Sequence, residues 1–196
     1  FADLVRQGKV HYIGVSEWTA DQIRAGKKLA DELGFRFISN QPQYSMLWRV
    51  IEGQVIPTSK ELGISQIVWS PIAQGVLTGK YLPGAPIPAG SRAADATGSS
   101  FIQKFMTEEV LTKVQKLIPI AQELGLEMGQ LAVAWVLQNE NVAAAIVGAS
   151  KPKQITANAK AAGVKLPADA MKKIDEILGG SIVTDPSLTQ SPPTRP

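Results

Sequence analysis

Residues 9–40 read KVHYIGVSEWTADQIRAGKKLADELGFRFISN, and this stretch decides the fold. The run from Lys9 to Val15 is apolar and rich in β-forming residues, which predicts a strand. Thr19 opens the pattern of a capping box and predicts the start of a helix, which Gly34 is expected to end. Residues 35–40 are again short, apolar and β-forming. The stretch therefore predicts a strand, a helix and a second strand in succession.

The same unit is repeated along the rest of the chain. Further strands are predicted at Ile64–Ser70 and Ala143–Val147. Further helices are predicted in five places: one that runs through Val55 and Leu62 and ends at Gly63, Glu108–Leu124 with Thr107 as its cap, Leu131–Gln138, Pro152–Gly163 and Leu166–Leu178. Four strands, each apolar on both faces and each followed by a helix, are typical of a parallel sheet covered by helices. The fold class is therefore α/β, with either a doubly wound sheet or a barrel.

The length favours half of a barrel. A complete (β/α)8 barrel needs about 200 to 250 residues or more, whereas this chain of 196 residues provides four strand–helix units. Half a barrel would expose two sheet edges and an apolar face, so we expect a missing N-terminal half, rather than a second chain, to close it. The first residue is Phe1 and not Met, which favours a protein that begins further upstream.

Two segments break the strand–helix pattern. Residues 82–100, LPGAPIPAGSRAADATGSS, have no periodicity and are long for a connection, which predicts a lid or binding loop or else a disordered segment. Residues 179–196 are rich in Pro, Ser and Thr and predict a flexible tail. We therefore expect one domain over residues 1–178.

Composition excludes several classes of function. The chain has 20 basic and 17 acidic residues and no long basic run, which argues against a nucleic-acid partner. No stretch reaches the roughly 18 apolar residues of a membrane span, so membrane insertion is not expected. Without Cys and with a single His, the chain offers no thiolate site, no Cys nucleophile and no multi-His metal site. A cytoplasmic location fits these features best.

Polar residues follow the predicted strands, where parallel α/β proteins bind their ligands. The side chains of Ser16, Asn40 and Gln41 could hydrogen-bond a planar polar ligand such as a carboxamide, or they could cap the strand ends. Trp69 offers an aromatic face on which a heterocycle could stack, or it could pack in the core.

Two further segments have features of phosphate sites. In SPIAQGVLTGK, residues 70–80, Gly75 and Gly79 permit close backbone approach and Lys80 carries a positive charge. The segment lacks the first glycine of a Walker loop and the hydroxyl after its lysine. Pro152 opens a helix whose free N–H groups could seat a phosphate, or the helix could simply be capped. Together with the amide groups and Trp69, these features indicate a dinucleotide lying across the strand ends.

These segments resemble the aldo-keto reductase superfamily, in particular the branch of the potassium-channel β-subunits and their bacterial reductase relatives. The resemblance is carried, in family order and spacing, by GKVHYIGVSEWT, NQPQY, WSPIAQGVLTGKY, the GSR of the long loop, QLAVAWVLQN and VGASKPKQITAN. It covers nearly the whole chain and implies an NADP(H)-binding (β/α)8 TIM barrel, of which this chain would supply strands five to eight.

The resemblance also implies roles for individual residues. Ser16 and Gln41 would hold the nicotinamide carboxamide, and Trp69 would stack on the nicotinamide ring. The diphosphate would be wrapped by Ser70, Pro71, Ile72, Ala73, Gln74, Gly75 and Lys80, and the adenosine and its 2′-phosphate would be held by Arg92, Gly148, Ser150, Gln154 and Asn158. The family's catalytic Asp, Tyr, Lys and His lie on the first four strands and have no counterparts here, so no catalytic residue is expected in this chain.

Besides lacking these catalytic residues, the chain departs from the family pattern at two positions. Glu17 stands where many reductases carry Asn, and Ala157 stands where relatives often carry an acidic residue near the adenine. His11 lies within the first predicted strand, which favours a packed or rim histidine and not a catalytic one.

The resemblance implies NADPH-dependent reduction of aldehydes or ketones by hydride transfer, with a Tyr acid protonating the carbonyl oxygen. Of the carbonyl pocket, the chain is expected to supply a few residues such as Trp18, Tyr44 and Trp48. The alternative is a non-catalytic nicotinamide-binding regulatory subunit or redox sensor that docks on a partner protein. A barrel that binds another phosphate ligand is a third interpretation. A homo-oligomer is compatible with all three.

Overall fold

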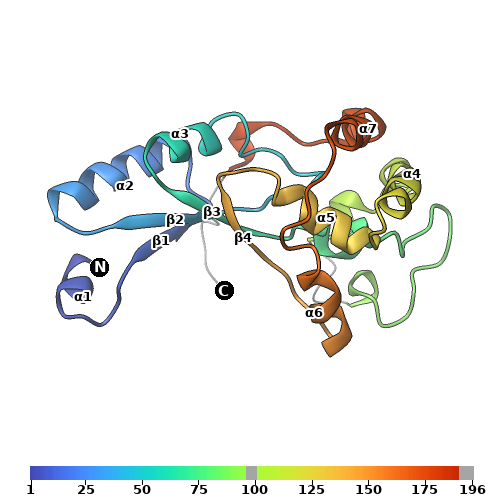
Figure 1. The fold of residues 1–196 in the computed structure, drawn as a ribbon, viewed down its shortest axis with the longest axis horizontal. Coiled ribbons are helices and arrows are strands. Elements are labelled where there is room, and N and C mark those ends of the chain that lie inside the picture. Colours follow the sequence, from blue (N-terminus) through green and yellow to red (C-terminus); the bar gives the residue numbers. More distant parts are fainter. Residues whose placement is uncertain (96–100, 190–196) are drawn as a thin grey trace.

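The computed structural model describes residues 1–95 and 101–189 (Figure 1). The strands are β1 (Ile13–Ser16), β2 (Phe37–Gln41), β3 (Ser65–Trp69) and β4 (Val142–Ile146). The α-helices are α1 (Ala2–Arg6), α2 (Ala20–Glu32), α3 (Val55–Glu61), α4 (Glu108–Glu123), α5 (Met128–Val136), α6 (Pro152–Ala159) and α7 (Ala168–Leu178). Short 3-10 helices occupy Ala73–Thr78 (η1), Arg92–Ala94 (η2), Gln103–Phe105 (η3), Gly179–Ser181 (η4) and Pro186–Leu188 (η5).

The four strands form one parallel sheet in the order β1-β2-β3-β4. Each strand thus pairs with the next one along the chain, and β1 and β4 form the two edges of the sheet. Parallel neighbours need a crossover connection, and α2, α3 and α5 each lie in one of the three crossovers (Figure 1). The α/β class is confirmed, while a closed barrel with these strands as the fifth to eighth stays a prediction.

One face of the sheet is covered by helices, and the other is open. Burial alternates along β3, where Gln66 and Val68 are buried and their neighbours are only partly so. In β4, Val142 is buried whereas Ala143 and Ile146 are exposed. The sequence predicts strands that are apolar on both faces, and half of a barrel that exposes one of these faces. Among the described residues nothing covers the second face of the sheet.

The core lies between the covered face and the helices. It takes Phe37 and Val68 from the sheet, Ile23 from α2, Ile56 from α3 and Leu131 from α5. Each of these side chains is less than a tenth exposed. Burial of this apolar surface is the main force that holds the helices on the sheet.

Local sequence explains why α2 begins where it does. The Thr19 hydroxyl accepts the N–H of Gln22 at 3.3 Å, and the Gln22 side chain accepts the N–H of Thr19 at 2.9 Å. This is the predicted capping box. Further along α2, position 26 requires glycine because an added Cβ would lie 2.4 Å from the ring of Trp18. That ring packs edge-on against Phe37.

The first strand is shorter than the sequence predicts. It starts at Ile13, because Gly8 adopts a left-handed φ of 67° and the residues after it form an exposed bend. His11 therefore lies before β1 and is exposed, so placing it within the strand was wrong.

The segment expected to be a flexible tail is partly fixed. The N–H of Val183 donates to the carbonyl of Leu47 at 2.9 Å, and the N–H of Arg49 donates to the carbonyl of Val183 at 2.8 Å. Thr189 is buried. A loose tail is therefore a wrong description of residues 179–189, whereas 190–196 lie outside the described residues.

Within the described ranges, no helix combines the length and apolar character needed to cross a membrane.

Candidate functional site

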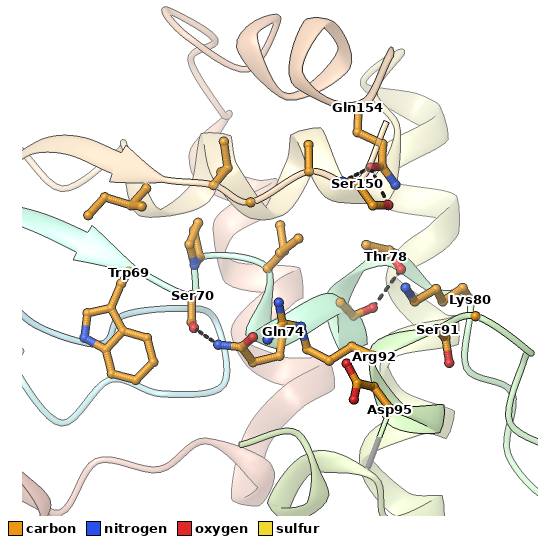
Figure 2. A pocket seen from close by; sticks show the side chains of 18 of the residues that line it. Trp69, Ser70, Gln74, Thr78, Lys80, Ser91, Arg92, Asp95, Ser150 and Gln154 are labelled. Carbon is orange, nitrogen blue, oxygen red and sulfur yellow. Dashed lines mark hydrogen bonds between the residues drawn. The ribbon is translucent and has the colours of Figure 1, made fainter. Parts of the chain in front are cut away.

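The turn after β3 has an unusual backbone. Ser70, Ala73 and Gln74 take left-handed φ values of 55°, 46° and 58°, which non-glycine residues rarely adopt. The Gln74 side-chain amide donates to the Ser70 hydroxyl and ties the turn together (Figure 2). Such strained residues persist where the surrounding contacts hold them, and they cluster at binding sites.

Gly75 and Lys80 form the far end of the same turn. Gly75 has a φ of 102°, and a Cβ at this position would lie 3.2 Å from the Lys80 ammonium. The Thr78 hydroxyl donates to the Gly75 carbonyl at 2.7 Å. The glycine thus allows the ammonium group to lie close to the backbone of the turn.

The long loop returns to this turn through residues 90–95. The N–H of Ala93 donates to the Tyr81 hydroxyl at 3.3 Å. Ser91 is buried, while Arg92 and Asp95 remain exposed to the cleft. Figure 2 shows Arg92 beside Gln74, so the loop adds a second cation to the side of the cleft that carries Lys80.

The opposite side of the cleft is the segment between β4 and α6. The Gln154 side-chain oxygen accepts the N–H of Ser150 at 2.8 Å, the N–H of Lys151 at 3.0 Å and the Ser150 hydroxyl at 3.2 Å. Gln154 therefore caps the start of α6. A phosphate could bind these N–H groups only by displacing the Gln154 oxygen.

These segments enclose a cleft of about 980 Å³ at the carboxyl ends of β3 and β4. Its lining consists of Trp69, Ser70, Pro71, Ile72, Gln74, Gly75, Thr78, Lys80, Gly90, Ser91, Arg92, Ala94, Asp95, Ile146, Val147, Gly148, Ala149, Ser150 and Gln154. A volume of this size can take a large ligand. Its cations and hydroxyl groups suit phosphate groups, and Trp69 at one end suits a flat ring (Figure 2).

A partly buried carboxylate holds Trp69. The indole N–H donates to Oε1 of Glu17 at 2.7 Å, and the N–H of Gln43 donates to the same oxygen at 2.5 Å. Phe101 packs edge-on against the indole, with ring centroids 6.4 Å apart. Burial raises the pKa of Glu17, while the two hydrogen bonds and the positive charge of Lys104 oppose that rise.

Ser16 and Gln41 lie side by side but outside the lining of this cleft. They are register partners in β1 and β2, and the Ser16 hydroxyl donates to the Gln41 carbonyl at 2.9 Å. Both are exposed on the strand ends. Their proposed contact with a carboxamide stays a prediction.

Asn40 has a structural role. Its side-chain amide donates to Oε1 of Gln66 at 3.1 Å, and its oxygen accepts the N–H of Trp18 at 3.4 Å. Because the side chain is fully buried, Asn40 agrees with the alternative of a strand-end cap and not with a ligand contact. Tyr44 is likewise buried, with its hydroxyl donating to Glu52 at 2.7 Å, and it lies outside the lining of the cleft.

The cleft brings together most of the residues predicted to bind a cofactor. Those in its lining are Trp69, Ser70, Pro71, Ile72, Gln74, Gly75, Lys80, Arg92, Gly148, Ser150 and Gln154. Ala73 is fully buried beside it. The Asn158 side chain lies outside the lining, next to Gly129.

Sequence reasoning missed Glu17 as the partner of Trp69, and it missed Thr78, Ser91 and Asp95 in the lining. Thr78 and Ser91 stand next to residues that were singled out, so their hydroxyl groups were an available signal. Nothing in the sequence indicated that Glu17 reaches across to β3, because that contact joins residues 52 positions apart.

The fold and the cleft define a class of protein: a parallel α/β protein with a cleft at its strand ends that is lined by cations, hydroxyl groups and an aromatic ring. Comparison with known families makes this specific. The model of the aldo/keto reductase family matches residues 1–179, and the chain therefore belongs to that family.

Similar proteins include a potassium channel subunit and a reductase. The chain is 39% identical over 197 residues to a probable voltage-gated potassium channel subunit beta of Arabidopsis thaliana, with 98% of the chain and 56% of the relative covered. It is 32% identical over 161 residues to an L-glyceraldehyde 3-phosphate reductase of Escherichia coli O157:H7, with 82% of the chain and 46% of the relative covered. The chain thus spans about half the length of these relatives.

Proposed function

We propose that the chain forms the NADP(H)-binding part of an oxidoreductase that reduces aldehydes or ketones by hydride transfer. We further propose that its strands are the fifth to eighth of a (β/α)8 barrel. The observation that carries the proposal is the joint placement of Trp69, Lys80 and Arg92 around one cleft in a chain of the aldo/keto reductase family.

Charge supports a nucleotide with an additional phosphate. Lys80 and Arg92 line the cleft on one side, and Ser150 and Gln154 line it on the other. An Arg guanidinium forms bidentate contacts with phosphate, and a Lys ammonium acts as a point charge. We therefore propose that the turn after β3 binds the diphosphate, and that Arg92, with the start of α6, favours NADP(H) over NAD(H).

The residues of this chain bind and orient the cofactor. When bound, NADPH supplies the hydride. Trp69 would fix the plane of the nicotinamide, while Ser16 and Gln41 would fix its carboxamide. Among the described lining residues there is no Tyr, His or Glu to protonate a carbonyl oxygen, so we place the acid on residues beyond this chain.

The second candidate is a non-catalytic nicotinamide-binding subunit that docks on a partner protein. Its support is the similarity to proteins named as potassium channel β subunits, from Arabidopsis thaliana and from Oryza sativa. Both candidates require the same cofactor cleft, and carbonyl turnover by the native protein separates them.

Titration of the native protein with NADPH, followed by intrinsic Trp fluorescence and by the emission of the nucleotide, tests the cofactor site. We expect NADPH to quench the protein and to bind more tightly than NADH. In Trp69→Phe we expect most of the quenching to be lost and affinity to fall on the order of tenfold, because a large stacking surface is removed.

Trp18 was expected in a carbonyl pocket, but it packs edge-on against Phe37 and lies outside the lining of the nucleotide cleft, so Trp18→Phe is the matched control for nucleotide binding. This variant should bind NADPH as tightly as the native protein, and NADPH should still quench its Trp fluorescence. A native protein that neither binds NADPH nor loses fluorescence would refute the cofactor site.

A further inference from the structure

Glu17 connects the end of β1 to the aromatic ring at the end of β3. It follows Ser16 directly and has a left-handed φ of 54°, a conformation that is costly for a residue with a Cβ. Family resemblance gives no function for a carboxylate at this position. The contacts of its side chain explain why the strained backbone is kept.

One carboxylate oxygen collects two donors. Oε1 of Glu17 accepts the Trp69 indole N–H at 2.7 Å and the backbone N–H of Gln43 at 2.5 Å. Hydrogen bonds to an ionised acceptor are roughly twice as strong as neutral ones. The indole is therefore tied at its N–H edge, while Phe101 contacts it edge-on at a centroid separation of 6.4 Å.

Burial raises the pKa of the Glu17 carboxyl, and a nearby positive charge opposes that rise. Lys104 is the cation that acts on Glu17. Its ammonium lies 3.4 Å from the centroid of the Trp48 ring and 3.5 Å from Oε1 of Gln43. The indole N–H of Trp69 thus contacts a polar group formed by Glu17, Gln43 and Lys104. This group carries one acidic and one basic side chain.

A tryptophan that stacks on a ligand gains affinity when its ring is already in the bound orientation, because less rotamer entropy is lost on binding. In the described structure, the hydrogen bond from Trp69 to Glu17 provides that restraint from the side of β1. The backbone bond from Gln43 in turn restrains the carboxylate itself.

We propose that Glu17 is a positioning residue for the nicotinamide nucleotide: it holds the indole plane of Trp69 in the orientation in which the nicotinamide stacks. This inference rests on the proposed function. Glu17 acts through Trp69 and requires no contact of its own with the cofactor.

A double-mutant cycle in the native protein tests this role. Glu17→Leu removes the acceptor, Glu17→Gln keeps an acceptor oxygen in its place, and each is combined with Trp69→Phe, whose ring has no N–H. Affinity for NADPH is measured from the emission of the nucleotide, which does not depend on Trp69. The near-ultraviolet circular dichroism of the free proteins reports how rigidly the indole is held.

We expect Glu17→Leu to weaken NADPH binding about tenfold and Glu17→Gln to weaken it less than about threefold. In the Trp69→Phe background, Glu17→Leu should cost less than about twofold, since the interaction it removes is already absent. Glu17→Leu should also reduce the circular dichroism of the indole in the protein with Trp69 and leave that of Trp69→Phe unchanged.

Two results would overturn the inference. One is an unchanged NADPH affinity in Glu17→Leu. The other is an equal loss in both backgrounds, which would assign the effect to the bond from Gln43 and not to Trp69. If the native protein does not bind NADPH, the proposed function fails, while the circular dichroism still shows whether Glu17 holds the indole.

Discussion

Left-handed backbone at non-glycine residues is concentrated next to the candidate site. Within residues 1–95 and 101–189, the non-glycine residues with positive φ are Glu17, Ser70, Ala73 and Gln74. Each such residue costs on the order of 1–3 kcal/mol and must be held by its surroundings. All four residues follow β1 or β3. The strained backbone therefore lies at the residue that holds Trp69 and in the turn that follows Trp69.

The Glu17 carboxyl makes stability depend on pH. Burial raises its pKa above the ordinary value of 4.5 in the folded protein. As pH rises from 4.5, the unfolded chain loses this proton before the folded protein does. The free energy of unfolding therefore falls with pH until the folded value is passed. We expect urea unfolding of the native protein to show this decrease in the free energy of unfolding. In Glu17→Gln the contribution of the Glu17 carboxyl to the decrease should be absent.

The two proteins are compared at matched pH values, so that titration of all other groups cancels. The stability of the native protein minus that of Glu17→Gln should decrease between pH 4.5 and neutrality. A difference that stays constant or increases over this interval would show that the pKa of Glu17 is not raised.

Residues of the site were predictable where they are adjacent in sequence. The sequence indicated that Trp69 could stack on a flat ring, and that residues 70–80 and those preceding α6 could bind phosphate groups. Most of these residues line the cleft. For Asn40 the sequence left a ligand contact and a strand-end cap open, and the structure pairs its amide with Gln66 on the neighbouring strand. Such a contact depends on strand register, which one sequence does not give.

Among the elements, those with strong local signals were predicted best. The capping box at Thr19 fixes the start of α2, and the Thr107 hydroxyl accepts the N–H of Val110 at 3.3 Å at the start of α4. The start of β1 was predicted too early, because residues 9–12 have β-forming side chains but no partner strand. Pairing, and not propensity, decides where a strand begins.

Removal of the cap on α4 gives a direct test at this scale. Thr107→Ala should lower the free energy of unfolding of the native protein by about 1 kcal/mol, since the N–H of Val110 loses its acceptor. Thr107→Ser keeps the hydroxyl and should be nearly neutral. Chemical denaturation measures both, and equal stability of the Ala and Ser variants would show that the hydroxyl contributes nothing.

For the whole molecule, the uncovered side of the sheet is the dominant feature. The strands β1 and β4 are unpaired on their outer sides among the described residues, and Ile38 and Ile146 are 37% and 43% exposed. Open edges beside apolar surface promote association with other strands. The relatives, of which this chain covers about half, contain additional sequence.

We therefore expect the 196-residue chain, when produced alone, to self-associate and not to melt cooperatively as a monomer. Sedimentation equilibrium measures the association, and scanning calorimetry measures the cooperativity of melting. A soluble monomer with a single sharp transition would contradict this expectation and show that the four-stranded sheet is stable without cover.

Every described residue that lines the cleft falls between positions 69 and 154. The lining therefore comes from one segment of the chain, even though its two sides follow different strands. Recombination between related genes can replace the whole cleft in one exchange and leave the segments that lead to β1 and β2 untouched. Such an exchange would bring in a new Trp69 region while Glu17, which holds the indole, stays with the segment that follows β1.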